Sequence, residues 1–517
     1  MHARFLNKML FIGGGFSTVL SLRYFVEDFL SMKKRSRSRT HTHITILDKN
    51  DDFGPGLAYG RSTSSGLLLN SPVSSMVVSH RGNEFLDWLE KNEGIWRGLV
   101  NLEPRLNSWR DSNRIHLARR HYDPVFMPRA VFGLFLKEMF DTTLKKAQTT
   151  NTLKVELRQA QAMSVTRHPG GVFETTLDDG GVLSADYLIL ATGSPSPLRF
   201  PLAEGGKGYF PDIYASGIEA IADFMIKTAK EKTTQLVCVG SNAAFMDVVH
   251  YLHNDRRLAD KVRITAISRS GKPPYGGIAE GDRETYRLQH LDALQTKQDL
   301  RAVELISAAE NEIEAARETG YVSEDRVLDL SVRKAILNIR ETLLENLSRV
   351  EKRIFAERFG RRFEGVMRRT AIESSLEASD FMEQDKLRYL SGNIERIEMT
   401  KNGFAVVFEH NGTKRTLFAD VAINCMGTPR LKDSDSLLFQ NLLTVGLIAP
   451  NDSGAGIEVN ENFEASPGLF VMGPMLGGGT SAGGEYFHHL EDVTAIGKYT
   501  PRLARVLGAA IAARIGE

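Results

Sequence analysis

The sequence predicts an α/β protein in which two Rossmann-like units are accompanied by a helical insert. Three observations lead to this fold class. A glycine run at residues 13–15 stands between an apolar strand and a helix. A long strand pattern occurs twice, over residues 155–195 and 387–429. A second arrangement of strand, glycine and helix begins around Gly240.

The first unit opens with a βαβ pattern. Residues 9–12 form a short apolar run that ends in glycine, which is typical of a buried parallel strand. Residues 16–32 carry apolar side chains at helical spacing, and residues 44–47 predict a second strand that ends at Asp48. Residues 33–43 are polar and basic and are expected to form a loop. Residues 51–78 predict a long ordered loop that lies over a site, because they combine turn residues with many apolar ones.

The two copies of the strand pattern match in detail. Each has an alternating strand, a glycine-containing turn, a second strand, an Ala-Asp pair and an apolar strand that ends in glycine. Asp186 corresponds to Asp420, and Gly193 corresponds to Gly427. Because each copy closes a nucleotide-binding unit, the chain is expected to contain two such units.

The second unit is expected to open before its copy of the strand pattern. Residues 235–239 and 262–267 predict strands, and residues 243–253 predict the helix between them. Residues from about 295 to 385 are charged and helical, and their charge is typical of a solvated face. The expected domains are residues 1–200 and 431–517 for the first unit, residues 201–295 and 387–430 for the second, and residues 296–386 for the insert.

Composition narrows the class of protein. The chain has 517 residues, enough for two or three domains, and a net charge of +1, which gives no overall attraction to nucleic acid or anionic membrane. No apolar run reaches the ~18 residues of a membrane span, and a signal peptide is not apparent. Only two cysteines occur, Cys238 and Cys425, without a Cys-x-x-Cys motif. We therefore expect a cytoplasmic protein that lacks a redox-active dithiol of that type.

The residues around the first glycine run fit a dinucleotide. Gly13 permits a tight turn, Gly15 lets a phosphate approach the backbone, and the helix N-terminus supplies N–H donors. Thr18 occupies the third position of the motif, where glycine or alanine is usual. Asp48 is placed to accept hydrogen bonds from ribose hydroxyls. The alternative is a glycine turn without a ligand.

The second unit carries a weaker glycine signal but an informative strand end. Gly240, Ser241 and Asn242 open the unit with a single glycine. The next strand ends in Ser268 and Arg269, where a carboxylate would favour NADH. Hydroxyl donors and positive charge, including Lys272, suit a 2′-phosphate instead, so NADPH is favoured. The alternative for Arg269 is a surface salt bridge.

The C-terminal segment offers a third contact to a cofactor. Residues 469–472 predict a strand that ends in Gly473 and Pro474, followed by a glycine-rich loop and a helix from about residue 485. A helix N-terminus aimed at a flavin would stabilise its reduced ring. His488 and His489 are interpreted as ordinary helix histidines, since no carboxylate or cysteine partner is visible. No metal site is expected, because metal-ligand spacing is absent.

Several stretches resemble a known family. They are IGGGFST, FGPGLAYG, LLLNSPVSSM, FMPRAVFGLFL, YLILATG, VCVGSNAAFMDVV, INCMGTP and LFVMGPM, in that order along the chain. The chain resembles the bacterial YdhS-like group of FAD/NAD(P)-binding proteins, distant relatives of flavin-dependent N-hydroxylating monooxygenases. The resemblance implies a flavoprotein with FAD in the first unit and NADPH in the second. It also implies that Tyr59, Asn70 and Met76 lie near the flavin, and that Gly473 and Pro474 contact its ribityl chain or ring.

The cofactor-binding residues expected from these arguments fall into two sets. For FAD they are Gly13, Gly15, Phe16, Ser17, Thr18, Asp48, Lys49, Tyr59, Asn70, Met76, Ala160, Thr192, Gly193, Gly473 and Pro474. For NADPH they are Gly240, Ser241, Asn242, Ser268 and Arg269.

The favoured function is an NADPH-using, FAD-dependent monooxygenase that N-hydroxylates a small amine or amino acid through a C4a-hydroperoxyflavin. The flavin carries this chemistry, so no catalytic side chain is assigned. Arg368 and Arg369 could clamp a substrate carboxylate, the alternative being solvated helix arginines. The expected partners are O₂ and a small substrate, with a homo-oligomer also open. Two other functions stay open: a reductase or dehydrogenase that passes electrons to a non-dithiol acceptor, and a non-catalytic FAD-binding protein.

Overall fold

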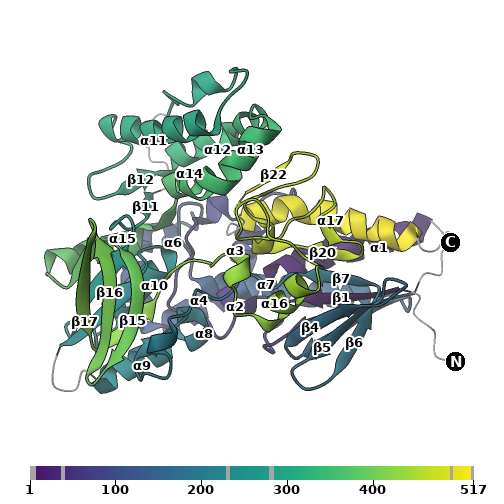
Figure 1. The fold of residues 1–517 in the computed structure, drawn as a ribbon, viewed down its shortest axis with the longest axis horizontal. Coiled ribbons are helices and arrows are strands. Elements are labelled where there is room, and N and C mark those ends of the chain that lie inside the picture. The colour runs from purple at the N-terminus through teal and green to yellow at the C-terminus, as the bar shows by residue number, and fades with distance from the viewer. Residues whose placement is uncertain (1–6, 36–40, 229–232, 279–284, 489–492, 514–517) are drawn as a thin grey trace.

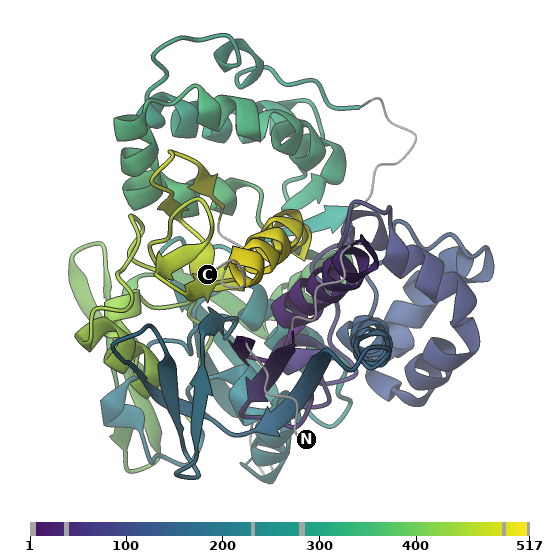
Figure 2. The same ribbon diagram turned by 90° about the vertical axis from the view of Figure 1, so that its right-hand side faces the viewer.

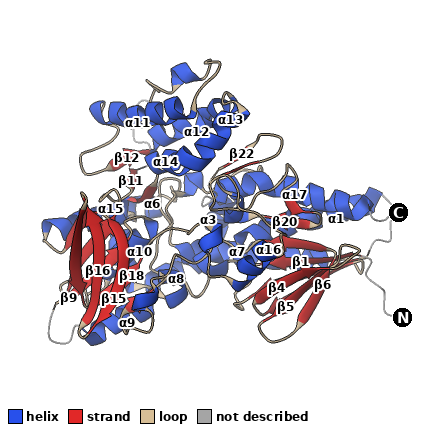
Figure 3. Ribbon diagram, viewed as in Figure 1, coloured by secondary structure: helices blue, strands red, loops and turns tan. Residues whose placement is uncertain are grey.

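The chain folds around two parallel sheets, which lie at opposite sides of the molecule in Figure 1, with the insert above and between them. The computed structural model describes residues 7–35, 41–228, 233–278, 285–488 and 493–513. Figure 3 shows helices packed around both sheets, as expected for an α/β protein. The predicted fold class of two Rossmann-like units with a helical insert is therefore confirmed.

The first sheet has the strand order β19-β20-β7-β1-β2-β3. All neighbouring strands are parallel except the edge pair of β19 and β20. The strands are β1 (Asn7–Ile12), β2 (Thr42–Asp48), β3 (Leu153–Gln159), β7 (Tyr187–Leu190), β19 (Glu464–Ser466) and β20 (Leu469–Val471). The sheet thus joins the N-terminal part of the chain to residues beyond 460, as the expected split of the first unit requires.

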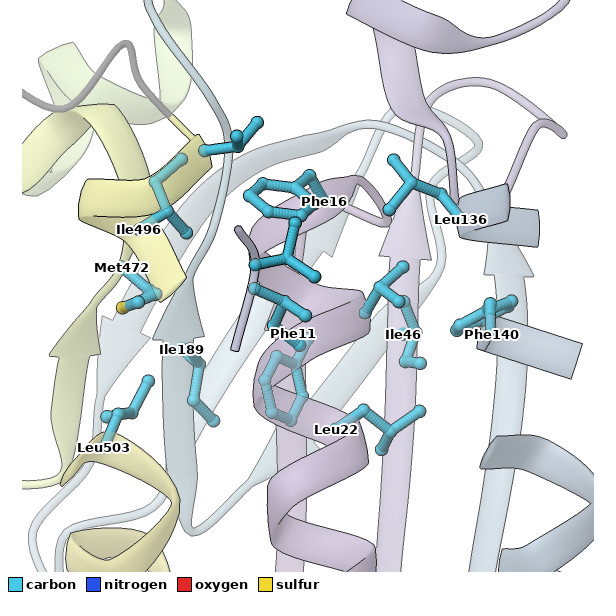
Figure 4. Packing of buried hydrophobic residues seen from close by; sticks show 14 of the residues in the cluster. Phe11, Phe16, Leu22, Ile46, Leu136, Phe140, Ile189, Met472, Ile496 and Leu503 are labelled. Carbon is cyan, nitrogen blue, oxygen red and sulfur yellow. The ribbon is translucent and has the colours of Figure 1, made fainter. Parts of the chain in front are cut away.

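Helix α1 (Phe16–Arg35) packs between α7 (Arg129–Ala147) and α17 (Val493–Ala513). Figure 4 shows the side chains that fill this layer, with Phe11 and Ile46 from the sheet, Phe140 from α7 and Ile496 from α17. All four are buried, and their removal from water is the main term that holds the helices on the sheet. Helix α1 runs to Arg35, three residues into the predicted loop at residues 33–43, because propensity alone does not mark this helix end.

The second sheet is parallel throughout, with the order β14-β10-β9-β18-β8. Its strands are β8 (Tyr209–Phe210), β9 (Thr234–Val239), β10 (Val262–Ser268), β14 (Leu387–Ser391) and β18 (Val421–Asn424). Its helices are α9 (Ile218–Thr228), α10 (Ala243–Asn254) and α15 (Ile372–Glu383). Helix α10 follows β9 as α1 follows β1, so the two units have the same local plan.

Each unit also carries an antiparallel three-stranded meander, and the sequence repeat lies at these meanders. The first consists of β4 (Ala162–Arg167), β5 (Phe173–Leu177) and β6 (Val182–Ala185), and the second of β15 (Asn393–Thr400), β16 (Gly403–His410) and β17 (Thr413–Ala419). The two aspartates that correspond in the repeat accept equivalent hydrogen bonds from backbone amides. Asp186 Oδ2 accepts from Lys8 N at 2.8 Å, and Asp420 Oδ2 accepts from Gln235 N at 2.8 Å.

The insert has its own small parallel sheet, which changes its expected boundaries. The order is β12-β11-β13, with β11 (Tyr275–Ile278), β12 (Val327–Asp329) and β13 (Arg369–Ala371). Its helices are α11 (Ala302–Glu318), α12 (Leu330–Glu345), α13 (Arg349–Ile354) and α14 (Gly360–Val366). Since α15 packs on α10 and leads into β14, we place the insert at residues 275–371 instead of 296–386.

The remaining short elements lie mostly between β2 and α7 and near the C-terminus. They are α2 (Gly56–Tyr59), α3 (Glu84–Lys91), α4 (Glu93–Leu102), α5 (Asn107–Ser112), α6 (Arg114–Ala118), α8 (Ile213–Ser216), α16 (Leu437–Thr444), β21 (Gly479–Thr480) and β22 (Tyr486–Phe487). Figure 2 shows the C-terminal helix α17 lying beside α1, with the β21–β22 hairpin next to the helices of the insert.

Candidate functional site

The first glycine turn leaves no room for a side chain at Gly13. This residue has φ +110°, and a Cβ built on it would lie 2.1 Å from the carbonyl oxygen of Ala191. The Gly13 amide donates to Leu47 O at 2.8 Å. The turn is therefore pressed between the ends of β2 and β7, and the N-terminus of α1 points to the carboxyl edge of the sheet, where anions bind in this fold.

Asp48 stands at this edge with hydrogen-bonding capacity to spare. Its Oδ2 accepts from Gly14 N at 2.7 Å, and its Oδ1 accepts from Asn50 N at 2.9 Å. A carboxylate offers about four acceptor positions, so a ribose hydroxyl can still donate to it. Ala160 lies next to it, because its amide donates to Asp48 O at 2.9 Å, and Lys49 is exposed beside it.

Thr18 shows why the third motif position tolerates a hydroxyl. The side chain is fully buried, and its Oγ1 donates to Gly13 O at 2.5 Å. The bond satisfies the buried hydroxyl and braces the glycine turn from the helix.

The Gly473 turn meets the start of α1. Gly473 has φ +80°, and a Cβ on it would lie 2.5 Å from Ser17 Oγ. Pro474 follows in a 3₁₀ turn over residues 473–476, and the preceding Met472 donates its amide to Leu190 O at 2.9 Å. The structure therefore brings Ser17, Phe16 and Gly473 to one place, although 456 residues separate Ser17 from Gly473.

The long loop after β2 covers the glycine turn, as the sequence predicts. Gly54 N donates to Gly14 O at 2.8 Å, and a Cβ on Gly56 would lie 2.8 Å from Gly15 Cα. Tyr59, at the end of α2, packs edge-on against Phe132 of α7 with ring centroids 4.9 Å apart. Close backbone contact thus shapes one wall of the site.

Asn70 and Met76 lie further along the same loop, near the insert and α17. Asn70 Oδ1 accepts from Thr370 Oγ1 at 3.3 Å, and Met76 is buried. Thr494 of α17 donates to Ser75 O at 2.9 Å.

The end of β7 offers open backbone. Thr192 and Gly193 follow this strand, and a Cβ on Gly193 would meet no atom within 4 Å. The backbone there is open to a ligand.

The second glycine turn repeats the first. Gly240 has φ +102°, and a Cβ on it would lie 2.5 Å from Cys425 O. Its amide donates to Ile267 O at 2.8 Å, as that of Gly13 donates to Leu47 O. The repeated contacts put Asn242, which precedes α10, in the position of a phosphate-facing residue at a helix start.

Ser268 takes the place of Asp48 in the second unit. Gly392 N donates to Ser268 O at 2.9 Å, just as Ala160 N donates to Asp48 O. Ser241 Oγ donates to Ser268 Oγ at 2.8 Å and contacts Lys272 O at 2.6 Å. Arg269 is exposed and forms no ion pair with any residue that the structure describes, so the surface salt bridge considered for it is not formed there.

Arg368 and Arg369 do not lie on a helix, unlike the solvated alternative considered for them. Arg369 is in β13, is 7% exposed, and donates from Nη2 to Ser71 Oγ at 2.8 Å. The carbonyl of Arg368 accepts from Tyr275 N at 3.1 Å. Arg369 begins β13 and Arg368 directly precedes it, so the role of the pair as a substrate clamp stays a prediction.

The C-terminal helix does not begin near residue 485. Residues 479–487 form the β21–β22 hairpin, and the described part of α17 begins at Val493. Glycines and two-residue strands carry no periodicity, which is why the sequence did not show the hairpin. The prediction of a helix that begins there with its N-terminus facing a flavin is therefore wrong.

His488 has the carboxylate partner that the sequence did not reveal. It is 2% exposed, and its Nε2 lies 2.8 Å from Glu341 Oε1 on α12. The hydrogen bond to His488 holds the pKa of Glu341 far below its usual range, and Lys498 adds to this. The hydroxyls of Tyr486 and Tyr499, both buried nearby, have no hydrogen-bond partner among the described residues. His489 lies outside the described residues.

A second buried histidine joins the two units. His250 on α10 is 2% exposed, with Nδ1 2.7 Å from Glu377 Oε2 and Nε2 2.8 Å from Gly66 O. Burial lowers the pKa of His250, but Glu377 and the Gly66 carbonyl raise it more, so that its pKa is raised overall. The charged ring can donate to both acceptors.

Replacement of His250 by glutamine is expected to lower stability most at acidic to neutral pH. A group whose folded pKa is raised stabilises fully below its unfolded pKa, about 6.5, and this contribution is lost as pH rises through the higher folded pKa. Breaking the buried pair should cost about 3 kcal/mol on the low-pH side. Urea unfolding at several pH values tests this. His253→Gln is the control, since His253 lies on the same helix as His250 but pairs with the half-exposed Asp380 of α15, at 2.7 Å. Equal losses at both sites, or a pH-independent loss at His250, would refute the assignment.

Two features are absent from the part of the chain that the structure describes. Across the described segments, no helix is both long enough and apolar enough to cross a bilayer. Within those same segments, no three His, Cys, Asp or Glu side chains gather as metal ligands would.

Comparison with known proteins supports the first unit directly and the fold as a whole. The model of an FAD-NAD(P)-binding family matches residues 10–195, which span the first glycine turn through Gly193. Uncharacterized proteins of Mycobacterium tuberculosis and Mycobacterium bovis are 26% identical over 499 residues, covering 92% of this chain and 91% of the relative.

Two solved structures are similar over almost their whole length. L-lysine 6-monooxygenase from Pseudomonas syringae has a TM-score of 0.51 at 13% identity, covering 98% of this chain and 99% of that chain. The reduced form of ornithine hydroxylase from Pseudomonas aeruginosa has a TM-score of 0.50 at 12% identity, with the same coverage. At such identities the likeness shows the fold. Residues 10–195 thus resemble an FAD/NAD(P)-binding family, and the chain shares its overall fold with these two enzymes.

Proposed function

We propose that this protein is an FAD-dependent, NADPH-using monooxygenase that N-hydroxylates a small amine or amino acid. One observation carries the proposal: the chain builds the same dinucleotide turn twice, with a carboxylate at the strand end of the first and a serine and an arginine at the second. Asp48 suits the ribose of FAD, whereas Ser268 and Arg269 suit the 2′-phosphate of NADPH.

The residues at the first turn fit FAD. The glycine turn and the first amides of α1 would hold the pyrophosphate, and Asp48 would accept from the ribose. The Gly473 turn beside Ser17 and the open backbone at Gly193 would border the rest of the cofactor. Gly54 and Gly56 contact the turn through Gly14 and Gly15, so this segment would border the bound cofactor. Bound FAD would supply the chemistry of electron transfer and oxygen activation.

Oxygen is favoured as the electron acceptor over a disulfide. The only two cysteines, Cys238 and Cys425, belong to the second unit, where Cys238 lies on β9 and Cys425 follows β18. Both are buried, and burial raises the pKa of Cys425, so its thiol is a poor nucleophile. Neither is at the first turn, where a dithiol would have to meet the flavin.

We infer an amine substrate because its oxygenation needs little acid–base catalysis from the protein. An amine nitrogen is already nucleophilic when deprotonated, so its oxygenation asks little acid–base catalysis of the protein. The solved structures of similar fold act on lysine and ornithine, which supports a primary amine as the substrate class. The balanced reaction is RNH₂ + NADPH + H⁺ + O₂ giving RNHOH + NADP⁺ + H₂O.

A product assay tests this function. Purified protein reconstituted with FAD is incubated with NADPH, O₂ and a panel of amines and amino acids, and hydroxylamine product is measured beside NADPH consumption. The proposal predicts at least one amine whose hydroxylamine forms in proportion to the NADPH consumed. NADPH consumption that yields only hydrogen peroxide with every amine, and rapid electron transfer to a quinone, would instead identify a reductase.

Arg269→Ala is expected to weaken the binding of NADPH and to leave the binding of NADH nearly unchanged. Losing a charge-assisted bond to the 2′-phosphate costs about 1.5–3 kcal/mol, or roughly 10- to 150-fold in KM for NADPH. Steady-state kinetics with both nucleotides measure this. Arg263→Ala is the control, because Arg263 is also exposed but lies near the start of β10, whereas Arg269 follows its end. Equal effects of Arg269→Ala on NADPH and NADH would remove Arg269 from this role.

A further inference from the structure

A buried ion pair connects the two units, between the start of α7 and the first half of α10. Arg129, at the start of α7, donates from Nη2 to Asp247 of α10, 2.9 Å from Oδ1 and 2.8 Å from Oδ2. Tyr214 of α8 donates its hydroxyl to Asp247 Oδ2 at 2.7 Å. Arg129 and Asp247 are 6% and 4% exposed. We call Arg129, Tyr214 and Asp247 the interdomain bridge.

On the side of the first unit, the bridge is tied to the loop that leads to Asn70. Arg129 Nε donates to Leu68 O at 2.9 Å, and Arg129 N donates to Leu67 O at 2.8 Å. One guanidinium thus holds the backbone two residues before Asn70 and also holds Asp247. The guanidinium therefore ties the two units together, because it bonds to Leu68 O of the first unit and to Asp247 of the second.

On the side of the second unit, the bridge grips the helix that begins at the second glycine turn. Asp247 stands five residues after Asn242, which is roughly 7–8 Å along the axis of α10. A shift of α10 therefore moves the amides that would hold NADPH. Burial raises the pKa of Asp247, while Arg129 and Tyr214 oppose this shift by bonding to the carboxylate. Removal of Arg129 would leave the Asp247 carboxylate buried without its ion-pair partner.

We propose that the interdomain bridge positions the NADPH-binding unit for hydride transfer to the flavin, with Asp247 and Arg129 as positioning residues. In that step a hydride passes from the nicotinamide to the flavin, leaving NADP⁺ and reduced flavin. The donor and acceptor atoms must come within about 3–3.5 Å, and a misplacement of about 1 Å costs on the order of 100-fold in rate. The inference rests on the proposed function, since it requires NADPH and FAD in the two units.

Anaerobic stopped-flow reduction of the FAD-loaded protein by NADPH tests the inference. Tyr214→Phe removes only one hydroxyl and should slow reduction at saturating NADPH several-fold, and Asp247→Asn should slow it 10- to 100-fold. The NADPH concentration for half-maximal rate and the FAD content should change little. Asp247→Glu, which keeps the charge, should recover part of the rate. Reduction of the same proteins by dithionite should stay at the wild-type rate.

Asp255→Asn is the matched control. Asp255 is also buried, at 5% exposure, and caps the same helix, but it pairs with Arg257 inside the second unit at 2.6 Å. It should lower stability without slowing reduction at saturating NADPH. Wild-type reduction rates in both Tyr214→Phe and Asp247→Asn would overturn the inference, as would equal slowing by Asp255→Asn.

A second readout needs no turnover and separates this inference from the proposed function. Spin labels at Lys145→Cys on α7 and Arg256→Cys beyond α10 report the distance between the units by double electron–electron resonance. We expect a single narrow distribution in the otherwise wild-type protein and a broader or shifted one with Asp247→Asn, with or without NADPH. An unchanged distribution would overturn the bridge. A broadened distribution in a protein that NADPH never reduces would leave the bridge standing and refute the function.

Discussion

Replacement of Gly13 by alanine is expected to abolish FAD retention and to lower the free energy of unfolding by about 3 kcal/mol or more. The alanine Cβ would lie 2.1 Å from Ala191 O in a backbone conformation with φ +110°. Relief of this overlap requires the turn to move away from β7, which displaces the α1 amides and Thr192 together. Flavin absorbance of the purified protein and urea unfolding measure the two effects.

Gly180→Ala is the control that separates the effect of steric overlap from the effect of backbone strain. Gly180 also has a positive φ, +79°, but a Cβ there would meet no atom within 4 Å, and the residue lies in the turn between β5 and β6. This variant should lose only about 1–2 kcal/mol and keep its flavin. A Gly13→Ala protein that retains a full complement of FAD would show that the cofactor does not sit on this turn.

Gly240→Ala is expected to weaken NADPH binding in a protein that still contains FAD. Its Cβ would lie 2.5 Å from Cys425 O at φ +102°, so the second turn must open as the first does. The Kd for NADPH should rise at least about tenfold, the equivalent of one lost hydrogen bond to a charged group. Isothermal titration with NADPH and the flavin content of the same sample give both quantities.

Gly412→Ala is the corresponding control in the second unit. Gly412 has φ +73° with open space around it, in the turn between β16 and β17. NADPH affinity should be unchanged in this variant. If Gly240→Ala lost FAD and NADPH together, or bound NADPH as tightly as the wild type, the assignment of one cofactor to each unit would fail.

Local sequence pattern was sufficient to predict the two glycine turns. Strand, glycine turn and helix lie within a few residues of one another at Gly13 and at Gly240, so short-range rules apply. The correspondence of Asp186 with Asp420 followed from the repeat and is matched by identical hydrogen bonds. Position relative to the strand end also gave Asp48 and Ser268 their equivalent places.

Contacts between distant parts of the chain could not be predicted from local sequence pattern. Glu341 and His488 are 147 residues apart, and Arg129 and Asp247 are 118 residues apart, so neither pair leaves a local signal. We place the insert boundaries differently from the sequence-based expectation because of β11 and β13, which are only four and three residues long. Such short strands are defined by pairing with each other, which one sequence does not reveal.

Anaerobic reduction by NADPH tests directly whether the first unit holds FAD and the second holds the NADPH that reduces it. Purified protein, supplemented with FAD if needed, should bind about one flavin per chain, and NADPH should bleach the flavin absorbance completely and faster than NADH does. A protein that takes up no flavin, or whose bound flavin stays oxidised with excess NADPH and NADH, would contradict the account.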